Sequence, residues 1–249
     1  MKTVNVSVII VHYNTPELLT DCLKSLYEYT KDVTFEVIIV DNNSKNKPDK
    51  NLKQYPDLTF INNKENYGFA KANNMAVVQA KGQYLLFLNS DTLLIENSLK
   101  KCMKYLDENP QTGILGPRLL NTDKTTQYYG SIINHWRYWG KKPRKVGFIS
   151  GAAMFIKKDL FQKIGGFDEH YFFYNEDVDL CKTVNKTGLN VIYFPGTSIV
   201  HLGGKSTTRS HMLRKQVYKS SWYFFKKHYL KLTPPHTGRT TDPLRKRKK

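Results

Sequence analysis

Residues 84–92, YLLFLNSDT, contain five apolar or aromatic residues that lead directly into an amide, a hydroxyl and a carboxylate. A short, continuous apolar run is typical of a strand covered on both faces, as in a parallel sheet. Asn89, Ser90 and Asp91 then follow the point where the strand is expected to end. Ordinary turn chemistry also accounts for Asp or Asn there, so the rest of the chain must decide whether these residues carry a function.

Two further apolar runs, residues 6–11 (VSVIIV) and 36–40 (EVIIV), have the composition of buried parallel strands. A helix is expected between them, because Thr15 suits its N-cap, Pro16 its first position, and the leucines around Cys22 form one apolar stripe. The same alternation predicts strands at 58–61 and 84–88 and helices at 69–81 and 98–108. Such alternation indicates an α/β fold with a mostly parallel, Rossmann-like central sheet and helices on both faces.

The second half of the chain is less regular. Residues 122–145 lose periodicity and gain aromatic and basic residues, which predicts a long loop or insertion. We then expect a strand over 148–156, a short helix capped by Asp159, a helix from Asn175 to Gly188, a strand over 191–194 and a helix over 211–231. The predicted organisation is one domain over residues 1–210, with halves at 1–121 and 146–210, a helix at 211–232 and a basic, disordered tail at 233–249.

The composition limits the class of protein. Three cysteines, Cys22, Cys102 and Cys181, form no C-x-x-C pair and lie in apolar contexts, so we expect core residues rather than disulfides or a zinc site. No apolar run reaches the roughly 20 residues that span a bilayer, so we expect no membrane span or signal peptide and predict a cytoplasmic protein. The formal charge of +18 favours anionic partners: nucleic acid, nucleotide or an acidic membrane face.

Polar side chains follow four predicted strands at the point where each strand ends. Residues 12–15 (HYNT), 41–44 (DNNS) and 63–69 (NKENYGF) join residues 89–91 in this respect. Ligands collect at the carboxyl ends of strands in open α/β sheets. The sequence therefore predicts a ligand site along one rim of the sheet.

Taken in order, six stretches resemble the family 2 glycosyltransferases of the GT-A fold, within a rhamnosyltransferase-like bacterial branch. The resemblance runs from residue 4 to about residue 230 and rests on SVIIVHYNTPELL, VIIVDNNS, ENYGFAKANN, YLLFLNSDT, GAAMFIKKDLFQKIGGFDEHYFFYNEDVDLC and HLGGKS. It implies a nucleotide-binding half at 1–121 and an acceptor half at 146–210. It also implies inverting transfer of a sugar, with rhamnose the best guess, from a dTDP- or UDP-linked donor to a glycan or lipid-linked acceptor in cell-surface polysaccharide biosynthesis.

The resemblance implies a divalent cation, Mg²⁺ or Mn²⁺, on the diphosphate of the donor, because a hard cation neutralises a phosphate leaving group. Asn89-Ser90-Asp91 takes the place of the family's D-x-D motif. Asp91 is expected to hold the metal, while Asn89 departs from the motif, lowers the negative charge of the site and is left to bond the ribose or a metal-bound water. His201 matches a further metal or phosphate contact, beside Gly203 and Gly204; the alternative is a structural histidine.

Base recognition is expected at the earlier strand ends. Asp41 matches the family's aspartate that accepts the N3–H of uracil or thymine, although an Asx turn is the alternative. The resemblance adds further residues to the nucleotide-sugar site, with a plain turn as the alternative for the glycine: Tyr13, Asn14, Asn66, Gly68, Phe69, Lys71, Asn89 and Ser90.

Residues 176–179 (EDVD) supply the acids for catalysis. Inversion requires a carboxylate that takes the proton from the acceptor hydroxyl, and Asp177 is the predicted base, with Glu176 orienting the acceptor hydroxyls. The alternative is that acids in a first helical turn only complement the helix dipole. Gly151 and Ala152 are predicted to leave room for an acceptor sugar, or simply to permit close packing, and aromatic residues at 170–173 suit either sugar stacking or the core.

Basic and aromatic residues mix along the predicted helix at 211–231, which suits peripheral contact with an anionic membrane at the inner face of the cell membrane. An amphipathic helix packed on the domain is the alternative.

Two other functions fit less well. A nucleic-acid-binding protein is not expected, because the strongest constellations are acidic rather than a basic, base-stacking stripe. A sugar nucleotidyltransferase would need a glycine-rich basic loop after the first strand, and residues 12–17 (HYNTPE) contain neither glycine nor arginine.

Overall fold

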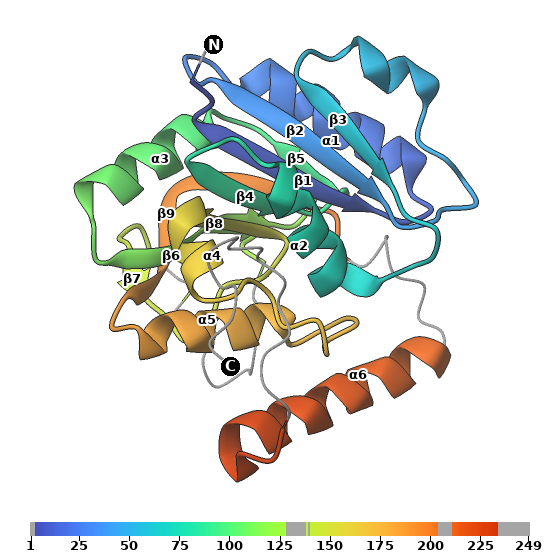
Figure 1. Cartoon of the computed structure of the whole chain (residues 1–249). Helices are drawn as coiled ribbons and strands as arrows, with labels where there is room; N and C mark the ends of the chain where they lie inside the picture. The colour runs from blue at the N-terminus through green and yellow to red at the C-terminus, as the bar shows by residue number, and fades with distance from the viewer. Residues whose placement is uncertain (1–2, 128–137, 139, 204–210, 234–249) are drawn as a thin grey trace.

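The computed structural model describes residues 3–127, 138, 140–203 and 211–233. Within these residues, nine strands form one sheet in the order β3-β2-β1-β4-β8-β6-β9-β5, and β7 pairs with β9 outside this path. Helices cover both faces of the sheet, and the last helix lies at the edge of the molecule (Figure 1). The predicted α/β fold is therefore confirmed.

The first half is a parallel sheet built as the sequence predicts. Its strands are β1 (Val6–His12), β2 (Phe35–Asp41), β3 (Leu58–Asn62) and β4 (Tyr84–Leu88), and its helices are α1 (Pro16–Tyr29), α2 (Gly68–Gln79) and the short 3₁₀ helix η1 (Lys50–Gln54). His12 pairs with Asp41, and Asp41 pairs with Asn62, so three strands end level with one another. This register sets the polar residues that follow them along one rim.

The second half turns the sheet into a mixed one. Its elements are β5 (Thr92–Leu94), α3 (Ser98–Glu108), β6 (Thr112–Leu120), β7 (Arg144–Lys145), β8 (Ala153–Lys157), α4 (Lys158–Lys163), α5 (Glu176–Lys186) and β9 (Asn190–His201). Strand β8 runs antiparallel between β4 and β6, and its first residue, Ala153, pairs with Leu88 at the end of β4. The residues just before β8 therefore reach the same rim as those just after β4.

Two apolar cores lie on opposite faces of the sheet because strand residues alternate in direction. On one face, Val8 and Leu86 pack in a cluster with α1 and α3. On the other, Ile9 and Phe87 pack in a cluster with α2, α4 and α5. All three cysteines are free and buried, as predicted.

Thr15 stands at the N-cap of α1, as predicted, although its hydroxyl bonds elsewhere and does not cap. Three predicted boundaries in the second half are wrong, each for a local reason. The strand expected from residue 148 begins only at Ala153, and Asp159 lies inside the first turn of α4, whose N-cap is Lys157. The strand expected at 191–194 continues to His201. Its pairing with β6 skips residues 195–197 at a register shift after Pro117 and then resumes.

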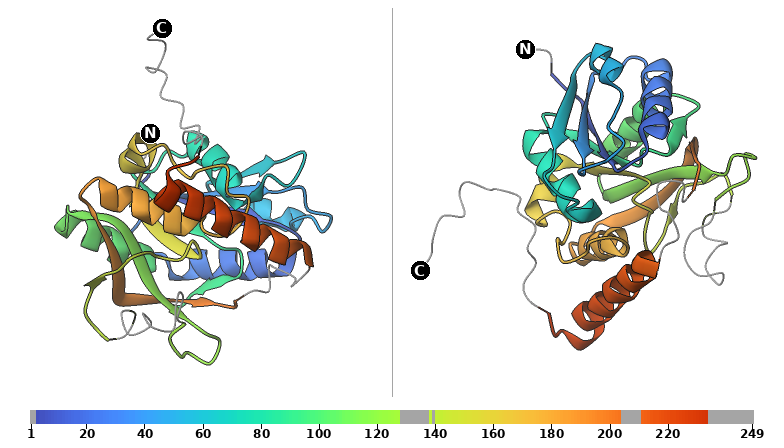
Figure 2. Two further views of the ribbon diagram at one scale, coloured as in Figure 1. Left: turned by 90° about the horizontal axis from the view of Figure 1, so that it is seen from below. Right: turned by 90° about the vertical axis from the view of Figure 1, so that its right-hand side faces the viewer.

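Helix α6 (His211–Phe225) continues into the π-helical turn η3 (Lys226–Leu230), and both views of Figure 2 show it lying beside α5. Of the helices that the structure describes, none is long and apolar enough to cross a bilayer. Gly204 and the basic tail at 234–249 lie outside the described residues.

Candidate active site

The carboxyl ends of β1 and β2 are joined by buried polar contacts. Asp41 is fully buried; its Oδ2 accepts from the Lys47 ammonium at 2.8 Å and its Oδ1 from the Ser44 amide at 3.0 Å. Burial raises the pKa of Asp41, but these hydrogen bonds outweigh burial and leave the pKa below its usual value. The carboxylate is therefore ionised and retains lone pairs for a further donor.

His12 links three segments of the rim. Its Nε2 lies 3.4 Å from the Asn46 carbonyl and its Nδ1 3.3 Å from the Thr15 hydroxyl, which lies 3.1 Å from the hydroxyl of Ser90. Burial lowers the pKa of His12, so the ring is neutral at neutral pH. A neutral imidazole that donates from Nε2 to the Asn46 carbonyl accepts at Nδ1 from the Thr15 hydroxyl. Because Thr15 also contacts Ser90, the residue pair links the segment after β4 to the end of β1.

Two predicted nucleotide-binding asparagines are engaged in loop contacts. The Asn14 side-chain oxygen accepts from the backbone amides of Lys45 and Asn46 at 2.6 and 3.1 Å. The Asn66 side-chain oxygen accepts from the Asn42 amide group at 2.8 Å and from the Gly68 amide at 2.9 Å. These oxygens shape the rim, so direct contact of Asn14 and Asn66 with a ligand stays a prediction.

Of the remaining nucleotide-site predictions, Ser90 and Gly68 are buried, whereas Tyr13 and Lys71 are accessible. Tyr13 is 43% exposed, and the Lys71 ammonium lies 4.1 Å from the centre of the Tyr67 ring. An exposed ring and a cation held over another ring are free to meet a flat, negatively charged ligand.

Asp91 and His201 meet where β5 pairs with the end of β9. Thr92 pairs with His201 in the antiparallel register, and the Leu202 amide donates to the Asp91 carbonyl at 2.9 Å. The His201 Nε2 lies 3.3 Å from the Asp91 Oδ1, and Asp91 is 1% exposed. Residues that are far apart in the sequence are thus brought together at the end of the sheet.

Gln127 fixes the orientation and tautomer of His201. Its Oε1 lies 2.6 Å from the His201 Nδ1, while its Nε2 donates to the Asn121 side-chain oxygen at 3.1 Å. Since Oε1 only accepts, the His201 Nδ1 carries a proton, and in the neutral ring Nε2 turns a lone pair towards Asp91. Histidines that bind metals are commonly held in this way.

The chemistry and spacing of Asp91 Oδ1 and His201 Nε2 fit two ligands of one divalent cation. Ligands at right angles in an octahedron with bonds of about 2.1 Å lie about 3 Å apart, close to the observed 3.3 Å. A carboxylate oxygen with an imidazole nitrogen suits Mn²⁺, and Mg²⁺ through the oxygen. Across the described residues, no group of three or more His, Cys, Asp or Glu could hold a metal ion.

Asp177 is connected to the rim through the turn before β8. Its Oδ2 accepts from the Gly151 amide at 3.0 Å, and the next residue, Ala152, accepts at its carbonyl from the Asn89 amide at 3.0 Å. A side chain at Gly151 would lie 3.3 Å from the Phe69 ring and 3.7 Å from the Asp177 Cβ. The predicted acceptor residues Gly151 and Ala152 therefore lie between the metal motif and the predicted base.

Burial raises the pKa of both Glu176 and Asp177. Burial raises the pKa of Asp177, partly offset by the Gly151 and Val178 amides that donate to it. Burial and then repulsion from Asp177 raise the pKa of Glu176 well above its usual value. Glu176 Oε2 is buried with no hydrogen-bond partner among the described residues, which leaves it for a hydroxyl that enters the site.

Gly68 forms one close contact between the two halves of the domain. Its φ is +79°, and a Cβ there would lie 2.2 Å from the backbone oxygen of Phe172, which accepts from the Phe69 amide at 2.8 Å. Only glycine combines this conformation with so close a backbone approach.

We expect Gly68→Ala to destabilise the protein more than Gly188→Ala does. Gly188 has a φ of +85°, and a Cβ added there would meet nothing within 4 Å, so alanine costs only the conformational strain, about 1–2 kcal/mol. Gly68→Ala adds a clash with backbone. Urea unfolding of both variants measures the difference, and equal losses would show that the Phe172 contact contributes nothing.

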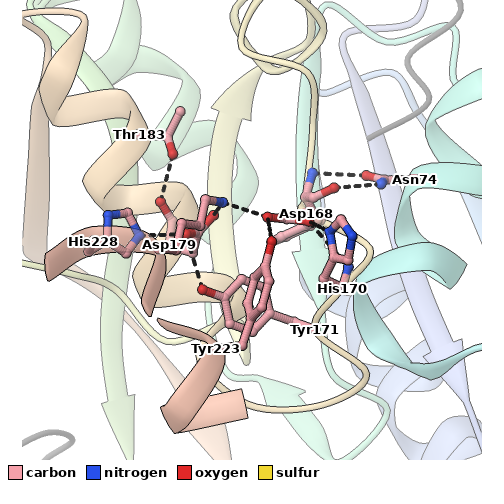
Figure 3. Close-up of polar contacts among 10 residues, drawn as sticks. Asn74, Asp168, His170, Tyr171, Asp179, Thr183, Tyr223 and His228 are labelled. Atoms are coloured by element: carbon pink, nitrogen blue, oxygen red, sulfur yellow. Dashed lines mark hydrogen bonds and ion pairs between the residues drawn. The ribbon is translucent and has the colours of Figure 1, made fainter. Parts of the chain in front are cut away.

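Asp179, the third acid of the cluster, is occupied by a network that anchors the C-terminal helix (Figure 3). Its Oδ1 accepts from His228 at 2.6 Å and from the Tyr171 hydroxyl at 3.2 Å, and its Oδ2 accepts from Lys227 at 2.8 Å. Lys227 also donates to Asp168 at 2.6 Å. Asp179 thus has a structural role that separates it from Glu176 and Asp177.

Asp168 is held ionised by this network. Burial opposes ionisation, but hydrogen bonds from Lys227 and His170 outweigh it and lower the pKa of Asp168 to about 2. A depressed pKa contributes stability that is present above the unfolded pKa near 4 and is lost as pH falls towards 2.

Asp168→Asn is therefore expected to lower the free energy of unfolding by about 2 kcal/mol at pH 7. The difference from the unmodified protein should shrink as the pH falls from 5 to 2. Denaturant unfolding over this range tests it, with Asp32→Asn as the control, because the Asp32–Lys100 pair is exposed and screened by solvent. A difference independent of pH would contradict the role of the ionised carboxylate.

The aromatic residues before α5 divide between core and surface. Tyr171 is fully buried, whereas Phe172 and Tyr174 are each 39% exposed. His170 stacks on Tyr223 of α6, with ring centres 5.1 Å apart. The prediction of sugar stacking therefore remains open for Phe172 and does not suit Tyr171, which belongs to the core.

Gln127, Asn42 and Lys47 contribute contacts to the candidate site but were not predicted. Asn42 lies within the DNNS stretch, in which the resemblance implies a role only for its neighbour Asp41. Gln127 belongs to a segment without periodicity, so no pattern marked it.

Residues 7–165 match the protein family described as Glycosyl transferase family 2. The chain is 28% identical over 221 residues to the O-antigen biosynthesis protein RfbC of Myxococcus xanthus, covering 80% of this chain but 17% of that protein. It is 25% identical over 245 residues to the N-acetylglucosaminyl-diphospho-decaprenol L-rhamnosyltransferase of Mycobacterium tuberculosis, covering 84% of this chain and 78% of that protein. The chain thus spans a small part of the first relative and most of the second.

A solved structure shows the same fold. The mannosyltransferase PcManGT from Pyrobaculum calidifontis, in complex with GDP-Man and Mn²⁺, matches with a TM-score of 0.69 and 21% identity, covering 90% of this chain and 63% of that one. The predicted GT-A fold is confirmed at this level.

Proposed function

The chain belongs to glycosyl transferase family 2, and from that premise we propose that it is a metal-dependent, inverting glycosyltransferase. It takes a sugar from a nucleoside-diphosphate sugar and transfers it to a hydroxyl of a glycan or lipid-linked acceptor in cell-surface polysaccharide biosynthesis. Rhamnose is the preferred sugar, because a relative that aligns over 84% of the chain is named as an L-rhamnosyltransferase.

Asp91 and His201 would hold Mg²⁺ or Mn²⁺ through Oδ1 and Nε2, which lie 3.3 Å apart. Bound there, the cation would neutralise the negative charge that develops on the diphosphate leaving group. Asn89, which follows β4 directly, offers an amide instead of a second carboxylate and suits the ribose or a metal-bound water.

Asp41 selects the base of the donor. As an ionised, acceptor-only group it takes the N3–H of thymine or uracil and rejects cytosine, which lacks that proton. Its pKa lies below the usual value because Lys47 and Ser44 donate to it against the cost of burial. A dTDP- or UDP-linked donor follows, with Tyr13 available to stack on the base.

Asp177 acts as general base. It takes the proton of the acceptor hydroxyl while that oxygen attacks the anomeric carbon, and the bond from that carbon to the diphosphate breaks with inversion. Glu176, whose Oε2 has no partner within the described residues, orients the acceptor. Burial raises the pKa of Asp177 towards the range in which a carboxylate accepts a proton efficiently.

The observation that carries this proposal is the short hydrogen-bonded path from Asp177 through Gly151 and Ala152 to Asn89. It sets a raised-pKa acid beside the rim that also bears Asp91 and His201. A panel of dTDP-, UDP- and GDP-linked sugars, assayed with Mg²⁺, Mn²⁺ or EDTA and with NMR of the product anomer, tests it. We expect turnover of a dTDP- or UDP-linked donor only with metal and with an inverted anomer; retention, or turnover in EDTA, would contradict it.

Gln127→Leu should weaken binding of Mn²⁺ by about 10- to 100-fold, because His201 loses the acceptor that fixes its tautomer. Titration calorimetry with Mn²⁺ and dTDP measures the affinity, and the ¹⁵N shifts of His201 report its tautomer. The exposed Gln79→Leu serves as the control. Unchanged affinity and tautomer would remove Gln127 from the metal site.

A further inference from the structure

The C-terminal helix has an inner face that is held to the domain by specific polar contacts. Ser220 donates to the Phe173 carbonyl at 2.8 Å, and Tyr223 donates to Asp168 at 3.0 Å. Lys227 bridges Asp168 and Asp179. The acids that receive these contacts lie in and next to α5, so the helix is fixed beside the segment that carries Glu176 and Asp177.

The opposite face carries an unusual row of exposed aromatic side chains. Tyr218, Trp222, Phe225 and Tyr229, here called the outer stripe, are 73%, 49%, 42% and 64% exposed; at the end of the stripe the Lys182 ammonium of α5 lies 4.6 Å from the centre of the Tyr229 ring. Their spacing of four, three and four residues lines them up along one side of a helix. Trp222 stacks on Phe225 and Phe225 on Tyr229, with ring centres 5.7 and 5.4 Å apart, so the stripe is continuous.

Basic residues accompany the outer stripe without any acid. Residues 211–233 contain six Lys or Arg and no Asp or Glu. Lys215 and Lys219 are exposed at helix positions that adjoin the stripe, and the Lys226 ammonium lies 5.9 Å from the centre of the Trp222 ring. Leu230 and Leu232 extend the apolar surface, with exposures of 44% and 68%.

This combination matches the chemistry of the membrane interface. Trp and Tyr settle at the boundary between headgroups and acyl chains, and lysines are attracted to anionic headgroups. A continuous exposed aromatic surface marks an interaction site in a folded protein. Self-association through this face would set the lysines of two copies against each other with no acid on the helix to compensate, so a second copy fits poorly.

We propose that the outer stripe, with Lys215, Lys219 and Lys226, docks the protein on the surface of an anionic bilayer. The inner face meanwhile holds the helix on the domain. The helix can therefore pack on the domain through one face and contact a membrane through the opposite face. The arrangement brings the start of α5 close to the lipid surface, where a lipid-linked acceptor would be presented. The proposal goes beyond the proposed sugar transfer and does not depend on it.

Flotation of the 249-residue chain with vesicles tests this directly. One set of vesicles is phosphatidylcholine alone and the other contains phosphatidylglycerol as well. The variants are Trp222→Ser with Tyr229→Ser, and Lys215→Glu with Lys219→Glu. Lys24→Glu with Lys104→Glu makes the same change of charge on exposed lysines of α1 and α3 and serves as the control.

We expect the unmodified chain to bind only the anionic vesicles, and salt to weaken this binding. The affinity for these vesicles should fall by about tenfold or more in each outer-stripe variant and should be retained in the control. All variants keep the basic tail, so binding that persists in both outer-stripe variants would overturn the proposal. Equal binding to both kinds of vesicle would also overturn it. So would dimerisation of the unmodified chain that the outer-stripe variants abolish, or displacement of the protein from the vesicles by single-stranded DNA. Thermal unfolding checks that each variant is folded, and no donor is present, so a failed sugar transfer would leave the result unaffected.

Discussion

Asp177→Asn is expected to lower kcat by about 10²- to 10⁴-fold, the contribution of a positioned general base. The amide keeps the shape of the side chain, and its oxygen can still accept from the Gly151 amide, which lies 3.0 Å from the native carboxylate. It cannot accept the proton of the acceptor hydroxyl. The affinity for the donor should therefore stay close to that of the unmodified enzyme.

Steady-state kinetics with calorimetric titration of the nucleoside diphosphate separates these effects. Asp159→Asn is the matched control, since Asp159 is an exposed acid in the first turn of another helix, α4. Because burial raises the pKa of Asp177, activity of the unmodified enzyme should fall on acidification at a pH above the usual range for aspartate. Full activity of Asp177→Asn would mean that another group takes the proton and that the first-turn acids serve only the helix dipole.

Asp91→Asn is expected to lower kcat/KM by about 10²-fold or more, because a cation at this position supplies several kcal/mol of stabilisation to the departing diphosphate. The variant replaces the charged carboxylate with a neutral amide oxygen, a weaker ligand, beside His201, which is held by Gln127 at 2.6 Å. Asn89→Asp should act in the opposite direction on metal affinity, since it restores a second carboxylate next to the same position.

Activity and Mn²⁺ affinity of Asp91→Asn are measured together, with Asp21→Asn on the exposed side of α1 as the control. Excess Mn²⁺ should recover part of the activity if the loss arises from metal binding. Undiminished activity of Asp91→Asn, together with turnover in EDTA, would remove the cation from the reaction.

The first half of the fold is well predicted because its signals are local. Strand β4 occupies residues 84–88 and α3 residues 98–108, as the apolar runs and periodicity indicate. Each βαβ unit buries its own continuous apolar strand, so a short window of sequence contains the information.

The second half is predicted less well because long-range pairing decides it. Strand β6 (Thr112–Leu120) contains two glycines and Pro117, which argue against a strand, and yet β8 and β9 pair with it on its two sides. Strand β9 runs through Pro195 and Gly196 to reach His201, a continuation that the local pattern does not favour. Only this extension brings His201 beside Asp91.

The candidate site shows the same division. The strand-end residues could be identified from sequence because parallel strands gather their carboxyl ends. The contacts of Asn14 and Asn66 with loop backbone could not, because they depend on how loops fold over the rim. Asp179 illustrates a further limit, since its partners Lys227 and His228 lie almost fifty residues away and no local pattern links them.

The most direct test is a crystal grown with Mn²⁺ and dTDP or UDP, with the metal located by anomalous scattering. We expect one strong peak bonded to Asp91 Oδ1 and His201 Nε2, with the diphosphate on it, the base at Asp41, and the open side of the phosphate facing Asp177. A metal and diphosphate bound elsewhere, or Asp177 turned away from the phosphate end of the nucleotide, would contradict a single site built from these two acids.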